Sequence, residues 1–244
     1  VNILIPWNGL GRMHDKYVIA DDSLYILGGR NTFGYFLGDY AGHKNYDRDV
    51  LVYNTGSKDS SIYQIKDYYK KITSQKCCSV FHYNESLENK YDKFLAGNYD
   101  YKANTYETNK INLLSNPTSL YTKQPTVYYG LMYLAKNAKK EVKIHTPYII
   151  CNDYMYKELK NIKVPTTIMT NSAENNGNIF GAVDYLNHKK DIINTGVTIK
   201  EYEGGISYHG KSMTIDDDIA IVGSFNMDMR SAYIDTELML VINS

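Results

Sequence analysis

The sequence predicts an α/β protein that contains an internal repeat. Short strand-like runs alternate with amphipathic segments of helical spacing, which is typical of an α/β sandwich. One strand-turn-strand pattern occurs twice, 195 residues apart, at residues 13–31 and 208–226. No apolar run reaches the ~18 residues of a membrane span. The 244 residues suffice for one large or two modest domains.

The strands are predicted from β-branched and aromatic runs. Residues 16–21 and 24–29 form a hairpin around an acidic turn, and residues 211–216 and 219–224 repeat it. Each half then has one further strand, at 48–54 in the first and at 236–242 in the second. Three more strands are predicted at 113–117, 141–150 and 164–171.

Three segments have helical spacing: 61–72, 126–140 and 180–196. Residues 85–126 are polar and weakly periodic, so we interpret most of this region as a connection between halves.

The two copies of the pattern agree at five positions with identical spacing. A single His-x-Lys-x4-Asp motif is a weak signal, but two copies with the same downstream Gly and Asn indicate a true repeat. The first copy is His14, Lys16, Asp21, Gly28 and Asn31, and the second is His209, Lys211, Asp216, Gly223 and Asn226.

Strand geometry separates these residues into two groups. Side chains alternate between faces, so the histidine and lysine of each copy project together. Asp21 and Asp216 lie at odd offsets from the lysines, and we expect them to fix turns rather than act in chemistry. Imidazole, ammonium and amide groups from two halves suit a phosphate ester, whose oxygens accept hydrogen bonds from lysine and asparagine.

Two histidines facing one phosphorus atom allow a complete reaction. One neutral ring attacks phosphorus and the other transfers the proton, without a metal or cofactor. Each ring needs a carboxylate to fix its tautomer. The candidates are Glu237 after the second motif and Asp49, or Asp47, after the first. Arg30 and Ser224 flank the asparagines and could contact phosphate, although a role in sealing the turn is equally open.

Composition sets limits on partners and compartment. Lys plus Arg equals Asp plus Glu at 27 each, which argues against binding nucleic acid by bulk charge. Three cysteines match neither a disulfide framework nor zinc-ligand spacing, and so favour a reducing compartment. We expect a protein in the cytoplasm or peripheral to the cytoplasmic membrane, with an upstream anchor left open because the chain does not begin with Met.

The paired motifs resemble those of the phospholipase D superfamily. The run Ser-x-Asn-x-Asp-x-Arg-Ser at 224–231 and the segment "HTPYII" are similar to its bacterial cardiolipin synthase branch. The resemblance implies two pseudo-twofold α/β/α halves with mixed sheets, an active site at their interface and a phosphohistidine intermediate. It maps onto the His, Lys and Asn of both motifs, with Glu237 and Asp49 as orienters of the rings.

The chain departs from the family pattern in two respects. Asp235 stands where the branch usually has Asn, and only thirteen residues precede His14. We therefore expect an incomplete first half. The predicted domains are residues 1–110, the C-terminal part of the first half with the connecting segment, and residues 111–244, the second half.

The first functional hypothesis is a phosphatidyltransferase of cardiolipin synthase type, acting on glycerophospholipids at a membrane surface. The alternatives are a phospholipase D-type hydrolase, a nuclease or other phosphodiesterase with the same site, and a non-catalytic relative that keeps only an anion site. Family habit assigns His14 as nucleophile and His209 as general acid and base. Oligomeric state stays open.

Overall fold

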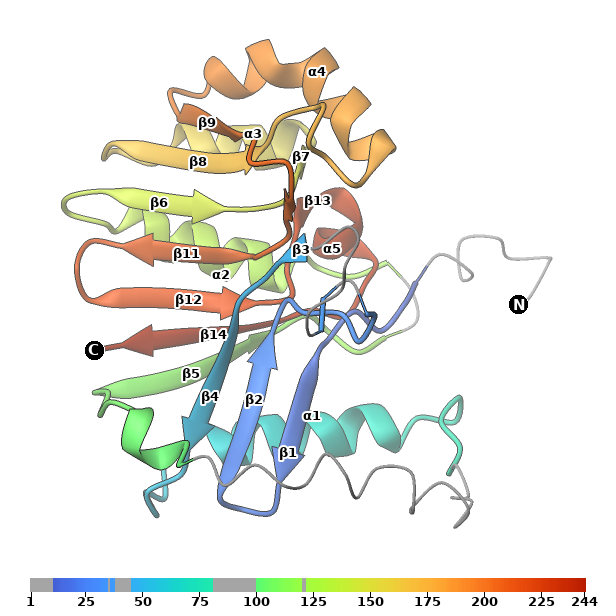
Figure 1. The fold of residues 1–244 in the computed structure, drawn as a ribbon, viewed down its shortest axis with the longest axis vertical. Coiled ribbons are helices and arrows are strands. Elements are labelled where there is room, and N and C mark those ends of the chain that lie inside the picture. The colour runs from blue at the N-terminus through green and yellow to red at the C-terminus, as the bar shows by residue number, and fades with distance from the viewer. Residues whose placement is uncertain (1–10, 35, 38–44, 81–99, 120–121) are drawn as a thin grey trace.

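A computed structural model describes residues 11–34, 36–37, 45–80, 100–119 and 122–244. Its largest element is a seven-stranded mixed sheet in the order β5-β14-β12-β11-β6-β8-β9 (Figure 1). The β6-β8 and β8-β9 pairs are parallel and the other pairs are antiparallel. The strands are β5 (Lys110–Ser115), β6 (Val142–His145), β8 (Thr166–Asn171), β9 (Thr198–Tyr202), β11 (Ser212–Ile215), β12 (Ile219–Gly223) and β14 (Leu238–Asn243).

A second, three-stranded antiparallel sheet has the order β1-β2-β4. Its strands are β1 (Tyr17–Ala20), β2 (Leu24–Gly28) and β4 (Asp49–Tyr53). Helix α1 (Ser61–Thr73) packs against this sheet through Ile62, Ile65 and Tyr68. Ser60 caps the helix by accepting a hydrogen bond from the amide of Ile62.

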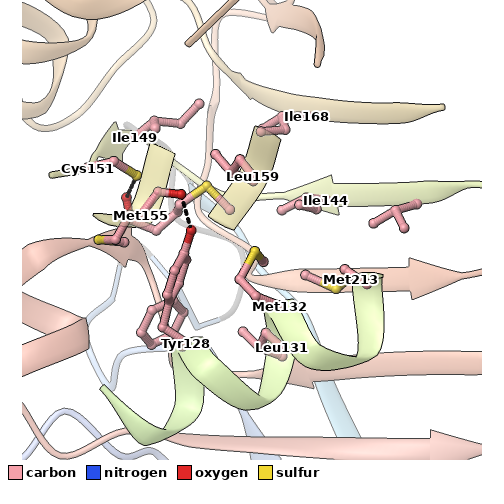
Figure 2. Packing of buried hydrophobic residues seen from close by; sticks show 14 of the residues in the cluster. Tyr128, Leu131, Met132, Ile144, Ile149, Cys151, Met155, Leu159, Ile168 and Met213 are labelled. Carbon is pink, nitrogen blue, oxygen red and sulfur yellow. Dashed lines mark hydrogen bonds between the residues drawn. The ribbon is translucent and has the colours of Figure 1, made fainter. Parts of the chain in front are cut away.

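The main core lies between the large sheet and its helices. These are α2 (Thr126–Lys136), α3 (Asp153–Lys160) and α4 (Ile179–Ile193). Tyr128 is fully buried and donates to the carbonyl of Met155 at 2.7 Å, which joins α2 to α3 (Figure 2). A buried phenol needs such a partner, because leaving its hydroxyl unpaired costs on the order of 1–3 kcal/mol.

Strand β14 connects the two cores. Leu238 and Leu240 pack with the residues of the small sheet and α1, whereas Met239 packs into the main core. This alternation follows from the period of two in a strand. The two sheets are therefore parts of one packed structure.

Two short parallel ladders lie between the ends of the larger strands. β3 (Asn45–Tyr46) pairs with β10 (Ser207–Tyr208), and β7 (Ile149–Ile150) pairs with β13 (Met227–Asp228). A single parallel bridge also joins Met13 to Thr236. The remaining elements are the short helix α5 (Met229–Tyr233) and the 3-10 turn η4 (Lys102–Asn104).

The predicted α/β class with mixed sheets is confirmed. The predicted helices form with small shifts, except that the segment expected to run to residue 140 ends at Lys136. Residues 141–150, expected as one strand, are divided into β6 and β7 around Pro147, because proline supplies no amide hydrogen to a ladder. Much of the predicted connection, residues 81–99, lies outside the described residues, and β5 joins the large sheet. The domain limits and the incompleteness of the first half stay predictions.

Among the described residues, no helix is long and apolar enough to cross a bilayer.

Candidate active site

The two motif-bearing hairpins are equivalent in their register. In the first, Gly28 lies opposite Asp49, and its amide donates to the carbonyl of Lys16 at 3.2 Å. In the second, Gly223 lies opposite Met239, and its amide donates to the Lys211 carbonyl, also at 3.2 Å. The internal repeat in the sequence is therefore a repeat in three dimensions.

This register identifies the equivalent carboxylates. Asp49 and Met239 are equivalent, because they lie opposite Gly28 and Gly223. The residues two positions before them are Asp47 and Glu237. Both side chains are fully buried, with 0% of each exposed. Asp47, rather than Asp49, is thus the counterpart of Glu237.

Each histidine pairs with the carboxylate of the other motif. His14 Nδ1 lies 2.9 Å from Glu237 Oε1. His209 Nδ1 lies 2.7 Å from Asp47 Oδ2. A neutral ring in this position donates its Nδ1–H to the carboxylate and keeps its lone pair on Nε2.

Backbone pairing explains the crossing. The segment before His14 runs parallel to the segment before Glu237, and the amide of Thr236 donates to the carbonyl of Arg12 at 3.1 Å. In the same way β10, just before His209, runs parallel to β3, just before Asp47. Each half therefore places its histidine strand beside the carboxylate strand of its partner half.

Asp49 does not orient a ring, and this expectation is corrected. Its carboxylate accepts from Arg30 Nε at 2.5 Å and from the Arg30 amide at 3.3 Å. The reason is position along the chain: Asp49 is the first residue of β4 and lies opposite Gly28, close to Arg30, whereas Asp47 precedes β4 and follows directly on β3, whose partner strand β10 leads to His209.

Arg30 and Ser224, expected as substrate-binding residues, instead support the scaffold. Besides Asp49, Arg30 donates to the carbonyls of Phe36 and Asp47. Ser224 is 1% exposed and donates to Glu237 Oε2 at 2.5 Å, so its hydroxyl holds the carboxylate. The open alternative of a turn-sealing role describes both residues better than phosphate contact.

The two lysines lie against their own histidines. Lys16 donates to the carbonyl of His14 at 2.5 Å. Lys211 is 1% exposed and donates to the carbonyl of His209. Its Nζ also lies 2.7 Å from Nδ1 and 3.1 Å from Nε2 of that ring. Among the described residues, nothing is hydrogen-bonded to His14 Nε2, so the two rings are not equivalent.

Both histidines and both asparagines of the motifs line one cleft, whose volume is about 340 Å³. Asn226 is 1% exposed, and its Oδ1 is a buried atom without a partner among the described residues. Buried amide atoms are normally paired, so this acceptor at the wall of the cleft is open to a donor from a ligand. The structure brings His14, Asn31, His209 and Asn226 together.

Sequence reasoning missed several residues of this cleft. The ring of Phe36 stands edge-on to His209, with centroids 5.0 Å apart. The motif spacing carried no signal for Phe36, since it follows the first motif without a counterpart in the second. The other missed lining residues are Arg12, Asn45, Pro147, Tyr148, Asn176, Gly177, Asn178 and Ser207.

Burial controls the charge of the site. It lowers the pKa of His209 to about 4, with a further lowering by Lys211, although Asp47 acts in the opposite direction. Burial also lowers the pKa of His14 and raises that of Glu237. Desolvation lowers the pKa of Lys211 to about 7. Both rings are therefore neutral in the ligand-free site near neutral pH.

Asp21 and Asp216 occupy turns, as expected. Both are left-handed, with φ of 52° and 53°, a conformation that Asp tolerates better than most residues. The carboxylate of Asp216 also accepts from the amides of Lys139, Lys140 and Glu141.

Fold and site together define an α/β protein in which two related hairpins supply paired His and Asn groups to one cleft, with a lysine against each histidine. Residues 131–244 match the family model described as "Cardiolipin synthase, PLD-like domain". This match, over slightly less than half of the chain, confirms the resemblance seen in the motifs.

Relatives extend the similarity to nearly the whole chain. An uncharacterized protein of Helicobacter pylori (strain ATCC 700392 / 26695) is 25% identical over 96% of this chain and 54% of its own length. Cardiolipin synthase 1 of Staphylococcus epidermidis (strain ATCC 35984 / DSM 28319 / BCRC 17069 / CCUG 31568 / BM 3577 / RP62A) is also 25% identical, over 96% of this chain and 44% of its own. The chain thus spans about half the length of these curated relatives.

A solved structure has the same fold. The phosphatidylserine synthase of Haemophilus influenzae Rd KW20 superposes with a TM-score of 0.63 over 96% of this chain and 58% of its own, at 16% identity. At this identity the likeness concerns the fold alone.

Proposed function

We propose that the protein is a phosphatidyltransferase of cardiolipin synthase type that works through a phosphohistidine. The observation that carries this proposal is the crossed arrangement, in which two neutral imidazoles of one cleft are each held at Nδ1 by a carboxylate. The match of residues 131–244 to the cardiolipin synthase domain supports a lipid phosphodiester as substrate.

His14 is the nucleophile in this proposal. Its Nε2 is not hydrogen-bonded by any described residue, whereas Nε2 of His209 lies 3.1 Å from Lys211 Nζ. A free lone pair is what attack on phosphorus requires. Contact with a lysine suits instead a ring that exchanges protons.

In the first step, His14 Nε2 forms a bond to phosphorus and the bond from phosphorus to the leaving alkoxide breaks. Protonated His209 gives its Nε2 proton to that oxygen. The bound phosphodiester anion favours this protonated form, since a negative charge nearby raises the pKa of a buried imidazole.

In the second step, His209 takes the proton of the acceptor hydroxyl, and that oxygen attacks phosphorus. The phosphorus–nitrogen bond breaks, and the lone pair returns to His14. The lysines and asparagines stabilise the phosphoryl oxygens in both steps. A lipid hydroxyl as acceptor gives transfer, and water gives hydrolysis.

The test uses the purified protein with phosphatidylglycerol vesicles, in the presence of EDTA, and lipid mass spectrometry. Cardiolipin formation that is lost in both His14→Ala and His209→Ala supports the proposal. Phosphatidic acid as the sole product would identify a hydrolase. Absence of any lipid product, with cleavage of an oligonucleotide, would identify a nuclease and overturn the lipid assignment.

The nucleophile is tested separately. Acid-labile label from a donor radiolabelled in its phosphate should accumulate on His14 in the wild-type protein. Label found on His209 by peptide mapping would reverse the assigned roles.

A further inference from the structure

The two copies of the repeat have different residue types at one pair of equivalent positions close to the histidines. Two residues before His14 stands Arg12, and two residues before His209 stands Ser207. Across the parallel pairings, Arg12 meets Asp235 and Ser207 meets Asn45. One end of the cleft is therefore built from an ion pair, and the equivalent end from neutral side chains.

The Arg12 side chain is held by Asp235 and is partly exposed to the cleft. Its Nε donates to Asp235 Oδ2 at 2.7 Å, and its amide lies 3.3 Å from Oδ1 of the same carboxylate. Asp235 is 0% exposed, while 46% of the Arg12 side chain is exposed and lines the cleft. Within the described residues, the hydrogen bonds of Arg12 use its backbone amide and Nε, and its two terminal NH2 groups have no hydrogen-bond partner.

Asp235 is well suited to this positioning task. It also lies 3.2 Å from Arg230 Nε, and Asn116 donates to its carbonyl at 3.3 Å. A buried carboxylate fixed from several sides holds its arginine in one orientation, which reduces the entropy lost when a ligand binds.

The surroundings of Arg12 favour a large polar ligand group. Tyr148 and Asn178 line the same cleft, together with His14. The two terminal NH2 groups of a guanidinium match the paired oxygens of a phosphate or phosphodiester. In the proposed mechanism Lys16 and Lys211 stabilise the phosphoryl group held between the rings, so Arg12 is available for a second anionic group.

We propose that Arg12, positioned by Asp235, binds the phosphodiester of the acceptor lipid. This inference rests on the proposed phosphatidyl transfer and supplies what the motifs leave open, namely the choice between lipid and water as acceptor. The acceptor hydroxyl of a phosphatidylglycerol is joined to its own phosphate through a short glycerol chain. Holding that phosphate beside His14 brings the hydroxyl toward the phosphohistidine and favours it over water.

The experiment compares three acceptors in one assay with a labelled phosphatidyl donor: phosphatidylglycerol, ethanol and water. Arg12→Gln should raise the KM for the phosphatidylglycerol acceptor by about 10- to 100-fold, as expected for loss of a charge-assisted bidentate contact. Transfer to ethanol and hydrolysis should change less than about threefold, because neither acceptor carries a phosphate. The ratio of hydrolysis to lipid transfer therefore rises.

Three variants complete the design. Arg12→Lys keeps the positive charge but loses the bidentate hydrogen-bonding geometry of the guanidinium, and should recover only part of the acceptor affinity. Asp235→Asn should weaken acceptor affinity in the same direction as Arg12→Gln. Lys140→Gln removes a positive charge from the surface, where Lys140 pairs with Asp217, and should leave the product ratio unchanged.

The outcomes separate the two proposals. If Arg12→Gln lowers all three reactions equally, the acceptor subsite is wrong although the transferase assignment stands. If the wild-type protein transfers no phosphatidyl group to any acceptor, the proposed function itself fails. A selective loss of transfer to phosphatidylglycerol supports both.

Discussion

At the scale of single residues, the assignment of the site depends on side chains two positions apart. Asp47 and Asp49 belong to the same short segment, yet only Asp47 contacts an imidazole. The difference arises from their positions along the chain: Asp49 begins β4 beside Arg30, whereas Asp47 lies before β4, next to the β3–β10 pairing that brings His209 close.

This contrast predicts unequal effects of two isosteric substitutions. Asp47→Asn should lower kcat by about 10²- to 10⁴-fold, because an amide does not fix the reactive tautomer of the ring or stabilise its cation. Asp49→Asn removes only a contact to Arg30 and should cost less than about tenfold. Steady-state kinetics on both variants checks this, and equal losses would contradict the assigned role of Asp47.

The lowered pKa of His209 predicts how stability depends on pH. In the unfolded chain a histidine takes up a proton near pH ~6.5, whereas in the folded protein the pKa of His209 is about 4. Between these values the unfolded state binds more protons, so acidification lowers the free energy of unfolding. The contribution is at most ~1.4 kcal/mol per pH unit for one group.

His209→Gln removes this contribution. Urea unfolding of the variant at pH 7, 6 and 5 should show a smaller loss of stability on acidification than the wild-type protein. Parallel pH profiles would mean that His209 titrates in the folded protein as it does in the unfolded chain.

At the scale of elements, the two equivalent turns differ in their side-chain contacts. Asp216 accepts from three backbone amides, while the side chain of Asp21 accepts from no backbone amide in the part of the chain that the structure describes. Both residues are left-handed, a conformation that glycine adopts without strain.

Replacing each aspartate by glycine should therefore separate the contribution of the side-chain hydrogen bonds from that of the left-handed backbone conformation. Asp216→Gly should destabilise the protein more than Asp21→Gly does, since the amides of Lys139, Lys140 and Glu141 lose their acceptor. Asp21→Gly should change stability by less than about 1 kcal/mol. Urea unfolding of both variants measures the difference, and similar losses would place the cost in backbone entropy instead.

Much of the element pattern could be predicted because periodicity and turn residues are local signals. The hairpins, α1 and the strand ending before Pro117 follow from short runs of residues. The helix expected over 126–140 stops early for a tertiary reason, since the amides of Lys139 and Lys140 bind Asp216, far away in sequence. The two-residue ladders β3-β10 and β7-β13 are too short to have a periodicity.

The site was predictable to a similar depth. The repeat revealed the His, Lys and Asn sets, because equal spacing can be read from one sequence. Aligning the two strands that follow the motifs would also have selected Asp47, since "VLV" at 50–52 matches "LVI" at 240–242. The crossed pairing and the role of Arg12 could not be predicted, because both depend on parallel contacts between distant segments.

At the scale of the whole molecule, β14 makes the two sheets depend on one another. Leu240 is fully buried in the core of the small sheet, while its neighbour Met239 packs into the main core. Loss of order in either sheet therefore exposes apolar surface in both.

A truncation in β14 should consequently affect the entire structure. Leu240→Ala is expected to cost about 2–5 kcal/mol, as for other large-to-small changes in a core. Hydrogen exchange of amides in β2 and β12 should accelerate by the same factor, because β12 pairs with β14 and β2 packs in the same core as Leu240. Acceleration confined to β2 would show that the sheets unfold independently.

The crossed histidine–carboxylate pairs also make the two motifs dependent on one another. A polypeptide with this geometry but only one motif would have a histidine without its carboxylate, unless a second copy supplied that group. With both motifs in one chain, the two equivalent positions need not be identical: Glu237 lies beside Ser224, whereas Asp47 lies beside Gly29.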